Sequence, residues 1–174
     1  MKDLKDYVIT IPDFPEKGIM FRDVTGILKD PDGLHAYIDA MTKALEGVDF
    51  DVILGPESRG FIFGMPVAYN LHKAFIPVRK PGKLPRETVS KEYSLEYGSS
   101  TLEIHKEDLL PGSKVVIIDD LIATAGTAKA IASMVEEMGA SVEKMIFAIE
   151  LAGLNGRELL KDYQVESIVS YEGK

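Results

Sequence analysis

The chain contains no cysteine, and this absence excludes several kinds of protein. Without thiols there can be no disulfide framework, no thiolate nucleophile and no zinc site built from cysteines. The three histidines, His35, His72 and His105, are not spaced as a metal-binding cluster either. A chain of 174 residues nevertheless buries about 70% of its extended surface on folding, so its core needs neither a disulfide nor a metal.

Long apolar stretches and an excess of basic charge are also missing. No run approaches the roughly 18 apolar residues of a membrane-spanning helix, and the start of the chain lacks the apolar core of a signal peptide. The formal net charge of −8 disfavours a general surface for nucleic acids. We therefore expect a cytoplasmic protein that binds neither membranes nor nucleic acids. Any anionic ligand must be held by a local cluster of basic residues.

The order of apolar and turn-forming segments predicts one α/β domain over residues 1–174, without repeats or linkers. Short apolar runs predict strands at residues 51–54, 74–78, 115–118, 144–149 and 165–169. Helical spacing predicts helices at residues 31–47, 60–72, 126–138 and 155–161. Asp30 is the expected N-cap of the first helix, and Pro66 predicts that the second helix starts late or kinks. The alternation of strands and helices predicts a parallel sheet with helices on both faces.

Two other segments lie outside this alternation. Prolines exclude a long helix over residues 1–26, but the segment is too apolar for a disordered tail, so we expect an irregular, ordered cap. Residues 92–97 and 101–105 alternate between apolar and polar around Gly98-Ser99, which predicts a β-hairpin.

The most informative stretch is 114–127. Its β-branched residues 115–118 predict a strand buried on both faces, and Asp119 and Asp120 follow where that strand should end. A turn of small residues, 123–127, then precedes a helix. Ligands of open α/β sheets bind at the carboxyl ends of strands, and a helix N-terminus offers free N–H groups to phosphate.

An acidic pair alone would more simply be a solvated surface feature. Beside a phosphate-binding turn, however, the two carboxylates can bind hydroxyls or a hydrated cation, and the combination indicates a sugar phosphate. The turn is not a P-loop, because it lacks the G-x-x-x-x-G-K-[ST] frame.

Basic residues gather in two loops that carry proline and glycine. Arg59 follows the strand at 51–54, and Arg79, Lys80 and Lys83 belong to the loop at 79–86. Each of them singly is expected to be a solvated surface residue. Their clustering favours an anion site, in which arginine can bind a phosphate through two hydrogen bonds.

The stretch 114–127 resembles the phosphoribosyl pyrophosphate (PRPP) binding motif of the type I phosphoribosyltransferase family, which is a hydrophobic strand, two acidic residues and a Thr-Gly-Gly-Thr-type turn. Segments 14–31, 55–64, 78–85, 96–98 and 102–106 resemble members of this family that act on adenine. The resemblance covers nearly the whole chain in the same order.

The resemblance implies a parallel sheet flanked by helices, with a short N-terminal hood at about residues 1–30. It also implies transfer of the 5-phosphoribosyl group from PRPP to adenine, which gives AMP and pyrophosphate, with Mg²⁺ carried by PRPP. A homodimer is implied as well. A loop from about Lys80 to Glu96 is expected to close over the site and exclude water.

The resemblance also implies roles for residues on the donor side. Asp119 and Asp120 would hold the ribose hydroxyls and the attached Mg²⁺. The residues implied to hold the 5′-phosphate are Ala123, Thr124, Ala125, Gly126 and Thr127. The residues implied to receive pyrophosphate are Ser58, Arg59, Arg79, Lys80 and Lys83. Ala125 stands where the family usually has glycine, and we expect it in an ordinary helical or bridge conformation.

The remaining implied roles concern the purine and the backbone. Phe21, otherwise a core aromatic, would stack on the base, while backbone groups of Met20 and Arg22 read its edge. Glu103 would be the catalytic acid–base group, with Glu96 as its competitor. On the alternating pattern alone, Glu103 faces away from Leu102 and Ile104 and is a solvated strand residue. A cis peptide is implied at Glu57–Ser58.

Two alternatives stay open. The base could be another purine, and a comparison of adenine with hypoxanthine and guanine as substrates would decide this. The chain could instead be a regulator that senses PRPP without turnover, although such proteins carry a DNA-binding element and this chain is acidic, with no spare length.

Overall fold

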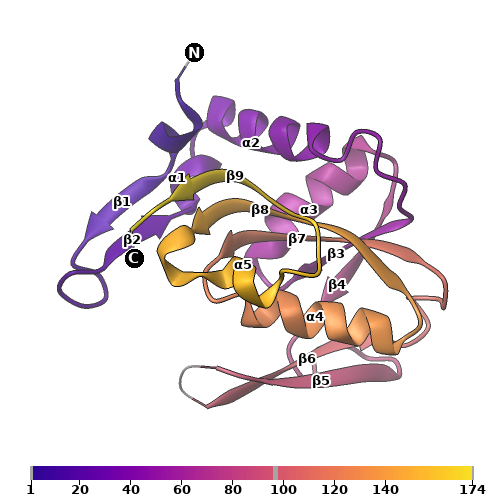
Figure 1. The fold of residues 1–174 in the computed structure, drawn as a ribbon. Coiled ribbons are helices and arrows are strands. Elements are labelled where there is room, and N and C mark those ends of the chain that lie inside the picture. Colours follow the sequence, from indigo (N-terminus) through magenta and orange to yellow (C-terminus); the bar gives the residue numbers. More distant parts are fainter. Residues whose placement is uncertain (1, 96–97, 174) are drawn as a thin grey trace.

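A parallel sheet of five strands forms the centre of the computed structural model, which describes residues 2–95 and 98–173. The strand order is β4-β3-β7-β8-β9, and every neighbouring pair is parallel (Figure 1). The strands are β3 (Val52–Pro56), β4 (Ala74–Val78), β7 (Lys114–Ile122), β8 (Ser141–Leu151) and β9 (Val165–Tyr171). The predicted parallel sheet is confirmed, and β7 and β8 extend beyond their predicted ends.

Helices cover both faces of this sheet, as predicted. Helices α2 (Pro31–Lys43) and α3 (Arg59–Asn70) pack on one face, and α4 (Gly126–Glu137) packs on the other. Alternate residues of β7 belong to different cores: Val116 and Ile118 pack with α2 and α3, whereas Val115 and Ile117 pack with α4. A strand that contributes to two cores must be apolar at every position, which explains its continuous β-branched run.

The helix ends follow local chemistry. The Asp30 carboxylate accepts hydrogen bonds from the amides of Asp32 and Gly33 at 3.0 and 3.3 Å, which confirms it as the N-cap of α2. Helix α3 contains Pro66 but already begins at Arg59, so the predicted late start is wrong. The last helix, predicted at 155–161, is shorter than expected: α5 spans only Gly156–Leu159 and follows a 3-10 turn at Ala152–Leu154. No helix in the described part of the chain is long and apolar enough to cross a membrane.

The N-terminal hood, taken as residues 2–30, is more regular than predicted. It contains an antiparallel pair, β1 (Ile9–Pro12) and β2 (Met20–Asp23), followed by the short helix α1 (Thr25–Leu28). The prediction of an irregular segment was wrong because Pro12 is the last residue of β1 and Pro15 lies between the strands, so neither proline interrupts a strand. The hood packs on α2, where Tyr37 donates a hydrogen bond to the Leu4 carbonyl at 2.9 Å. Figure 1 shows it beside the carboxyl ends of β8 and β9.

The predicted hairpin is confirmed. Strands β5 (Thr88–Ser94) and β6 (Ser99–His105) pair antiparallel, and the hairpin lies against α4 (Figure 1). The Tyr93 hydroxyl is 3.2 Å from the Thr127 hydroxyl at the start of that helix. Because β5 spans Thr88–Ser94, the second part of the segment predicted as a closing loop from 80 to 96 is a paired strand. Glu96 and Tyr97 lie outside the described residues.

Candidate active site

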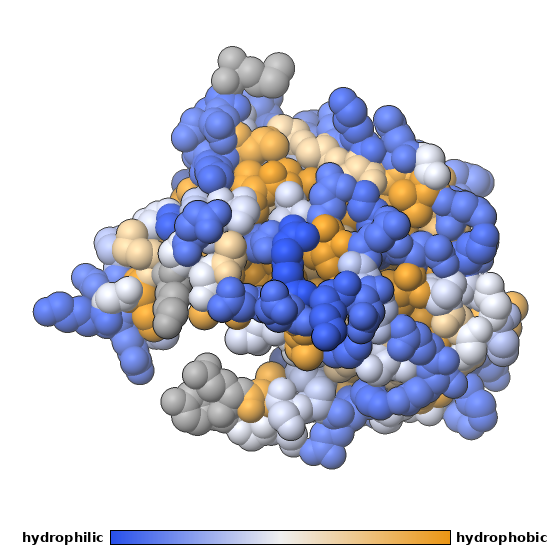
Figure 2. All heavy atoms as spheres, in the orientation of Figure 1, coloured by the Kyte–Doolittle hydropathy of each residue, from blue (hydrophilic) through white to orange (hydrophobic). Residues whose placement is uncertain are grey.

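A cleft of about 900 Å³ opens at the carboxyl end of β7. It is lined by the acidic pair, by the turn 123–127 and by residues of neighbouring elements, namely Arg59, Ser94, Leu95, Phe147, Leu154 and Leu159. A smaller pocket of about 180 Å³ adjoins it and shares Arg59, Asp119, Asp120 and Thr127. Figure 2 shows the surface hollowed beside the N-terminus of α4. This is the edge at which open α/β sheets bind ligands.

The turn before α4 has a left-handed residue. Ala125 has φ 69° and ψ 12°, so the expectation of an ordinary helical or bridge conformation was wrong. An alanine costs about 1 kcal/mol in this region because its Cβ crowds the backbone. The turn is held from behind by α5, where a Cβ on Gly156 would lie 2.2 Å from the Ala123 carbonyl oxygen. Tight packing therefore fixes the turn, and the first residues of α4 place their free N–H groups next to it.

The acidic pair is only partly satisfied by the protein. The Asp119 carboxylate accepts the Asp120 amide N–H at 2.8 Å. Buried Asp120 has its Oδ2 2.7 Å from Arg59 Nε, but the contact is not aligned as a hydrogen bond and leaves this oxygen without a donor. Burial raises the pKa of Asp119 well above its ordinary value, and the Asp120 carboxylate raises it further.

These two carboxylates fit a hydrated cation or sugar hydroxyls. The unpartnered Asp120 oxygen can accept a hydrogen bond, and the crowded negative charge favours a positive neighbour. Within residues 2–95 and 98–173, no group of three or more His, Asp or Glu side chains could hold a metal by itself. The donor set therefore suits Mg²⁺ that keeps waters and takes its other ligands from a phosphorylated substrate.

Three of the five residues predicted to receive pyrophosphate lie together. Ser58, Arg59 and Lys80 line the smaller pocket, and the peptide between Glu57 and Ser58 is cis, as the resemblance implies. Arg79 lines neither cavity in the described structure. Its Nε and Nη2 lie 3.0 Å from Glu57 Oε2, and its Nη1 donates to the Lys83 carbonyl at 3.3 Å.

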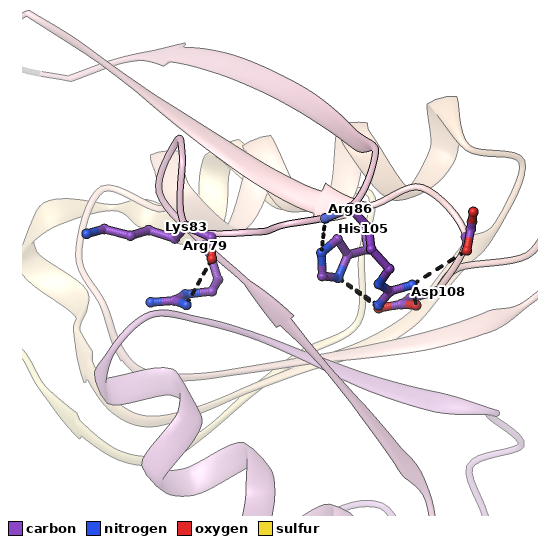
Figure 3. A network of polar contacts seen from close by, with 6 residues as sticks. Arg79, Lys83, Arg86, His105 and Asp108 are labelled. Atoms are coloured by element: carbon purple, nitrogen blue, oxygen red, sulfur yellow. Dashed lines mark hydrogen bonds and ion pairs between the residues drawn. The ribbon is translucent and has the colours of Figure 1, made fainter.

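Glu57 holds the loop that carries Lys80. Its second carboxylate oxygen accepts the Lys80 amide at 2.9 Å. Burial opposes the charge of Glu57, but the Lys80 amide and the Arg79 guanidinium lower its pKa. Lys83 also lines neither cavity, and Figure 3 shows its side chain extending in the same direction as that of Arg79, away from His105.

Glu103 is not brought to the cleft. Its carboxylate accepts hydrogen bonds from the Gly82 amide at 3.2 Å and from the Ser90 hydroxyl at 3.3 Å. Leu102 lines the smaller pocket, and successive strand residues point to opposite faces, so Glu103 points away from it. The catalytic role of Glu103 stays a prediction without support from this geometry, and its competitor Glu96 is outside the described residues.

The residues predicted to bind the purine also lie apart from the cleft lining. Met20, Phe21 and Arg22 form part of β2. The Phe21 ring packs edge-on against Phe14, with ring centroids 5.2 Å apart. The Arg22 guanidinium lies 4.1 Å from the centroid of the Tyr171 ring and donates to the Thr10 hydroxyl. The Arg22 side chain is thus already occupied.

Several residues that line the cleft were not predicted from the sequence. Phe147 lies opposite Asp119 in the pairing of β7 with β8. Aligning the predicted strand 144–149 with the strand before the acidic pair could have indicated it. Leu154 and Leu159 come from the segment after β8 and wall the cleft. Glu57 was read only as part of a loop, although it organises the basic residues.

Comparison with known proteins identifies the family of the chain. Residues 24–172 match the model of the phosphoribosyl transferase domain family. The chain is 66% identical over its full length to the adenine phosphoribosyltransferase of Agathobacter rectalis, which it also covers completely.

Two solved structures are similar in fold and sequence. The adenine phosphoribosyltransferase of Thermoanaerobacter pseudethanolicus superposes with a TM-score of 0.92 at 52% identity, covering 97% of this chain and 98% of that one. The Saccharomyces cerevisiae enzyme, solved with adenine and an imino-altritol bisphosphate, gives a TM-score of 0.88 at 40% identity, covering 95% and 96%. The chain therefore belongs to the phosphoribosyltransferase family and, within it, to the adenine phosphoribosyltransferases, which transfer the 5-phosphoribosyl group of PRPP to adenine in purine salvage.

Proposed function

We propose that the cleft at the carboxyl end of β7 converts adenine and PRPP to AMP and pyrophosphate. This proposal rests on the Asp119–Asp120 pair beside the turn that opens α4. One buried oxygen of Asp120 is paired with Arg59 but receives no aligned hydrogen bond. Assays with adenine, hypoxanthine and guanine test the choice of base, and a preference for an oxopurine would contradict it. PRPP binding without any AMP formation would instead support a PRPP-sensing regulator.

On the donor side, residues 123–127 hold the 5′-phosphate through backbone N–H groups and the hydroxyls of Thr124 and Thr127. Asp119 and Asp120 accept hydrogen bonds from the ribose hydroxyls. Orienting the ribose in this way aligns its C1 carbon between the departing pyrophosphate and the attacking N9 of adenine.

Magnesium is part of the proposal. Asp119 and Asp120 would hold it together with PRPP oxygens, and the ion would neutralise charge on the departing pyrophosphate. Removing divalent cations with a chelator should abolish turnover, and adding Mg²⁺ back should restore it.

The pyrophosphate is received in the smaller pocket by Ser58, Arg59 and Lys80. Lys83 joins them from the neighbouring loop when the charge develops. Arg79 contributes through Glu57, because its guanidinium is already paired there. A ligand phosphate competes with Glu57 for Arg79 only at the cost of leaving a partly buried carboxylate unpaired.

The hood supplies adenine recognition in this proposal. Phe21 stacks on the purine, and backbone groups of Met20 and Arg22 read its edge, since the exocyclic amine needs an acceptor and a ring nitrogen needs a donor. The relative solved with adenine supports a base site in this fold. The purine proton goes to a hairpin carboxylate, either Glu103, which would first have to leave Gly82, or Glu96.

A homodimer is also proposed. Helix α3 exposes Ile62, Met65 and Tyr69, which lie three and four residues apart and so share one face of the helix. Tyr69 is 85% exposed, which is unusual for a large apolar side chain without a partner. Sedimentation of wild type and Met65→Glu tests this: the wild type should be dimeric and the variant should dissociate. A monomeric wild type would refute the proposal.

A cytoplasmic location completes the proposal. PRPP, AMP and pyrophosphate are highly charged, and the core of a bilayer excludes such groups. The enzyme is therefore proposed to work in the compartment in which its substrates are made, and cell fractionation checks this.

A further inference from the structure

The loop that carries Lys80 and Lys83 is tied to one strand of the hairpin. This cationic loop, defined as residues 79–86, begins where Arg79 and Glu103 exchange two backbone hydrogen bonds of 2.9 and 2.7 Å. The Glu103 carboxylate then accepts the Gly82 amide at 3.2 Å. The first half of the cationic loop is therefore tied to β6 through Glu103, in addition to its contacts with Glu57.

The second half is tied two residues further along the same strand. His105 Nε2 lies 3.3 Å from the Arg86 amide nitrogen, and His105 Nδ1 lies 2.9 Å from Arg86 Nη2 (Figure 3). The Arg86 guanidinium also makes two hydrogen bonds of 2.8 Å to the Asp108 carboxylate. Since residues two apart on a strand share a face, Glu103 and His105 hold the two halves of the cationic loop from one side of β6.

His105 is buried and has charged groups on each side. Asp108 Oδ2 lies 3.2 Å from its Nδ1, and Arg86 lies between the ring and Glu107. Next in sequence, Lys106 pairs with Glu87 at 2.8 Å, and β5 pairs with β6 along the far side. Hydrogen bonding by Arg86 lowers the pKa of Asp108, against the opposing effect of burial, so this pair stays charged at neutral pH.

The hydrogen bonds require a neutral ring. Each neutral tautomer of histidine has one nitrogen that accepts, so it can take an N–H either from the Arg86 main chain or from the Arg86 guanidinium. The imidazolium form has two N–H donors and accepts neither of them. It would also add a positive charge next to the Arg86 guanidinium, and of the nearby carboxylates only Asp108 contacts both groups, while the more exposed Glu107 contacts Arg86 alone.

We propose that His105 is a positioning residue, an inference that rests on the proposed pyrophosphate role of the cationic loop. In its neutral form His105 accepts a hydrogen bond from Arg86 and so holds the loop in place. When it is protonated it can no longer accept, and Arg86 is then held only by its guanidinium contacts with Asp108 and Glu107. Among the described residues, His105 is not part of the lining of either cavity. Its protonation loosens the end of the loop next to Lys83, so PRPP and pyrophosphate bind more weakly in acid while adenine is unaffected.

Steady-state kinetics of three variants between pH 5.5 and 8 test this proposal. His105→Gln keeps an acceptor for the Arg86 amide but cannot be protonated. His105→Leu fills the space without an acceptor, and His35→Gln removes an exposed histidine on α2 as a control. Because PRPP phosphates also titrate near pH 6, the ratio of wild type to His105→Gln isolates the contribution of the imidazole.

The expected results are specific to positioning. The KM for PRPP of the wild type should rise about fivefold more than that of His105→Gln as pH falls, which corresponds to the loss of one hydrogen bond. At pH 7.5 His105→Leu should show a similar increase in the KM for PRPP, and His105→Gln should not. The KM for adenine should be unchanged in all variants, and His35→Gln should follow the wild type.

Two results would overturn the proposal. One is a His105→Gln enzyme whose KM for PRPP follows the wild-type pH profile. The other is a folded His105→Leu enzyme, judged by its melting temperature, that binds PRPP like the wild type. If His105→Leu does not fold, the pH profile of His105→Gln alone decides the question.

Discussion

The residues proposed to bind PRPP and those proposed to bind adenine are assembled to different degrees in this structure. On the donor side, Asp119, Asp120, Arg59 and Thr127 already line two adjoining cavities. On the acceptor side, the residues expected to handle adenine line neither of them, and these are Met20, Phe21, Arg22 and Glu103. The donor side is built on carboxyl ends of the central sheet, whereas the acceptor side is built on two separate hairpins.

This difference has a physical basis. Strands β3, β7 and β8 are buried on both faces and paired on both edges, so the groups at their ends have little freedom. An isolated two-stranded hairpin is marginally stable, and the β5–β6 hairpin packs against α4. We therefore expect PRPP to bind first to a site that is already formed, and adenine to require further closure of the hairpins.

The largest effect is expected from the acidic pair. Replacing Asp119 and Asp120 together by Asn removes two charged acceptors, and PRPP affinity in Mg²⁺ should fall by about 10²–10⁴-fold. Titration calorimetry measures this, with Asp39→Asn on the exposed face of α2 as the matched control. Unchanged PRPP affinity would remove the pair from the donor site.

A stability measurement tests the wall of the donor cleft. Arg157, within α5, makes hydrogen bonds of 2.7 and 2.8 Å to the buried Glu150 carboxylate. Hydrogen bonding by Arg157 lowers the pKa of Glu150, against the opposing effect of burial. The resulting stability is present above the pKa of an unfolded glutamate, near 4.3, and is lost as pH falls through the lower folded value.

The corresponding variant is Glu150→Gln. At pH 7 it should lower the free energy of unfolding by about 2 kcal/mol. This is less than the loss expected for a fully buried ion pair, because Arg157 is half exposed. Urea denaturation should show this difference shrinking below pH 4, and exposed Glu158→Gln should show no such change. A difference that grows in acid would contradict the account.

Glu103→Gln distinguishes a loop support from a catalyst. The geometry predicts an increase of about fivefold in the KM for PRPP with kcat little changed, because the Gly82 amide loses a charged acceptor. A loss of kcat of about 10²-fold or more, with PRPP binding intact, would instead make Glu103 the acid–base group. Exposed Glu46→Gln is the control.

The smallest effect is expected at the left-handed turn residue. Ala125→Gly should raise the free energy of unfolding by about 0.5–1 kcal/mol, because glycine tolerates a positive φ. In Ala128→Gly, inside α4, the same change should lower it by about 1 kcal/mol. Thermal denaturation of the pair separates the two, and destabilisation by both would show that Ala125 is not strained.

The same contrast explains what could be predicted from sequence. The stretch 114–127 is contiguous, so the buried run 115–118 and the acidic pair after it predicted the strand and the position of the cleft. The two faces of the sheet followed from the alternation of strands and helices. Non-local contacts could not be foreseen: the pairing of Arg79 with Glu57 joins two loops, and the turn of Glu103 toward Gly82 depends on how β6 meets β4.

Two misjudged segments show other limits. Prolines in the hood masked two strands that need only a few backbone hydrogen bonds. Ala125 was judged by its own preference, whereas the packing of Gly156 against Ala123 determines the path of the turn. In both cases tertiary contacts overrode local propensity.

The most direct test of the contrast is calorimetric titration of the ligand-free enzyme with each substrate alone. The account predicts saturable binding of PRPP with Mg²⁺ and no saturable binding of adenine until pyrophosphate or a PRPP analogue is present. Adenine that binds the free enzyme as tightly as it binds the loaded enzyme would contradict a preformed donor side and an acceptor side completed by closure.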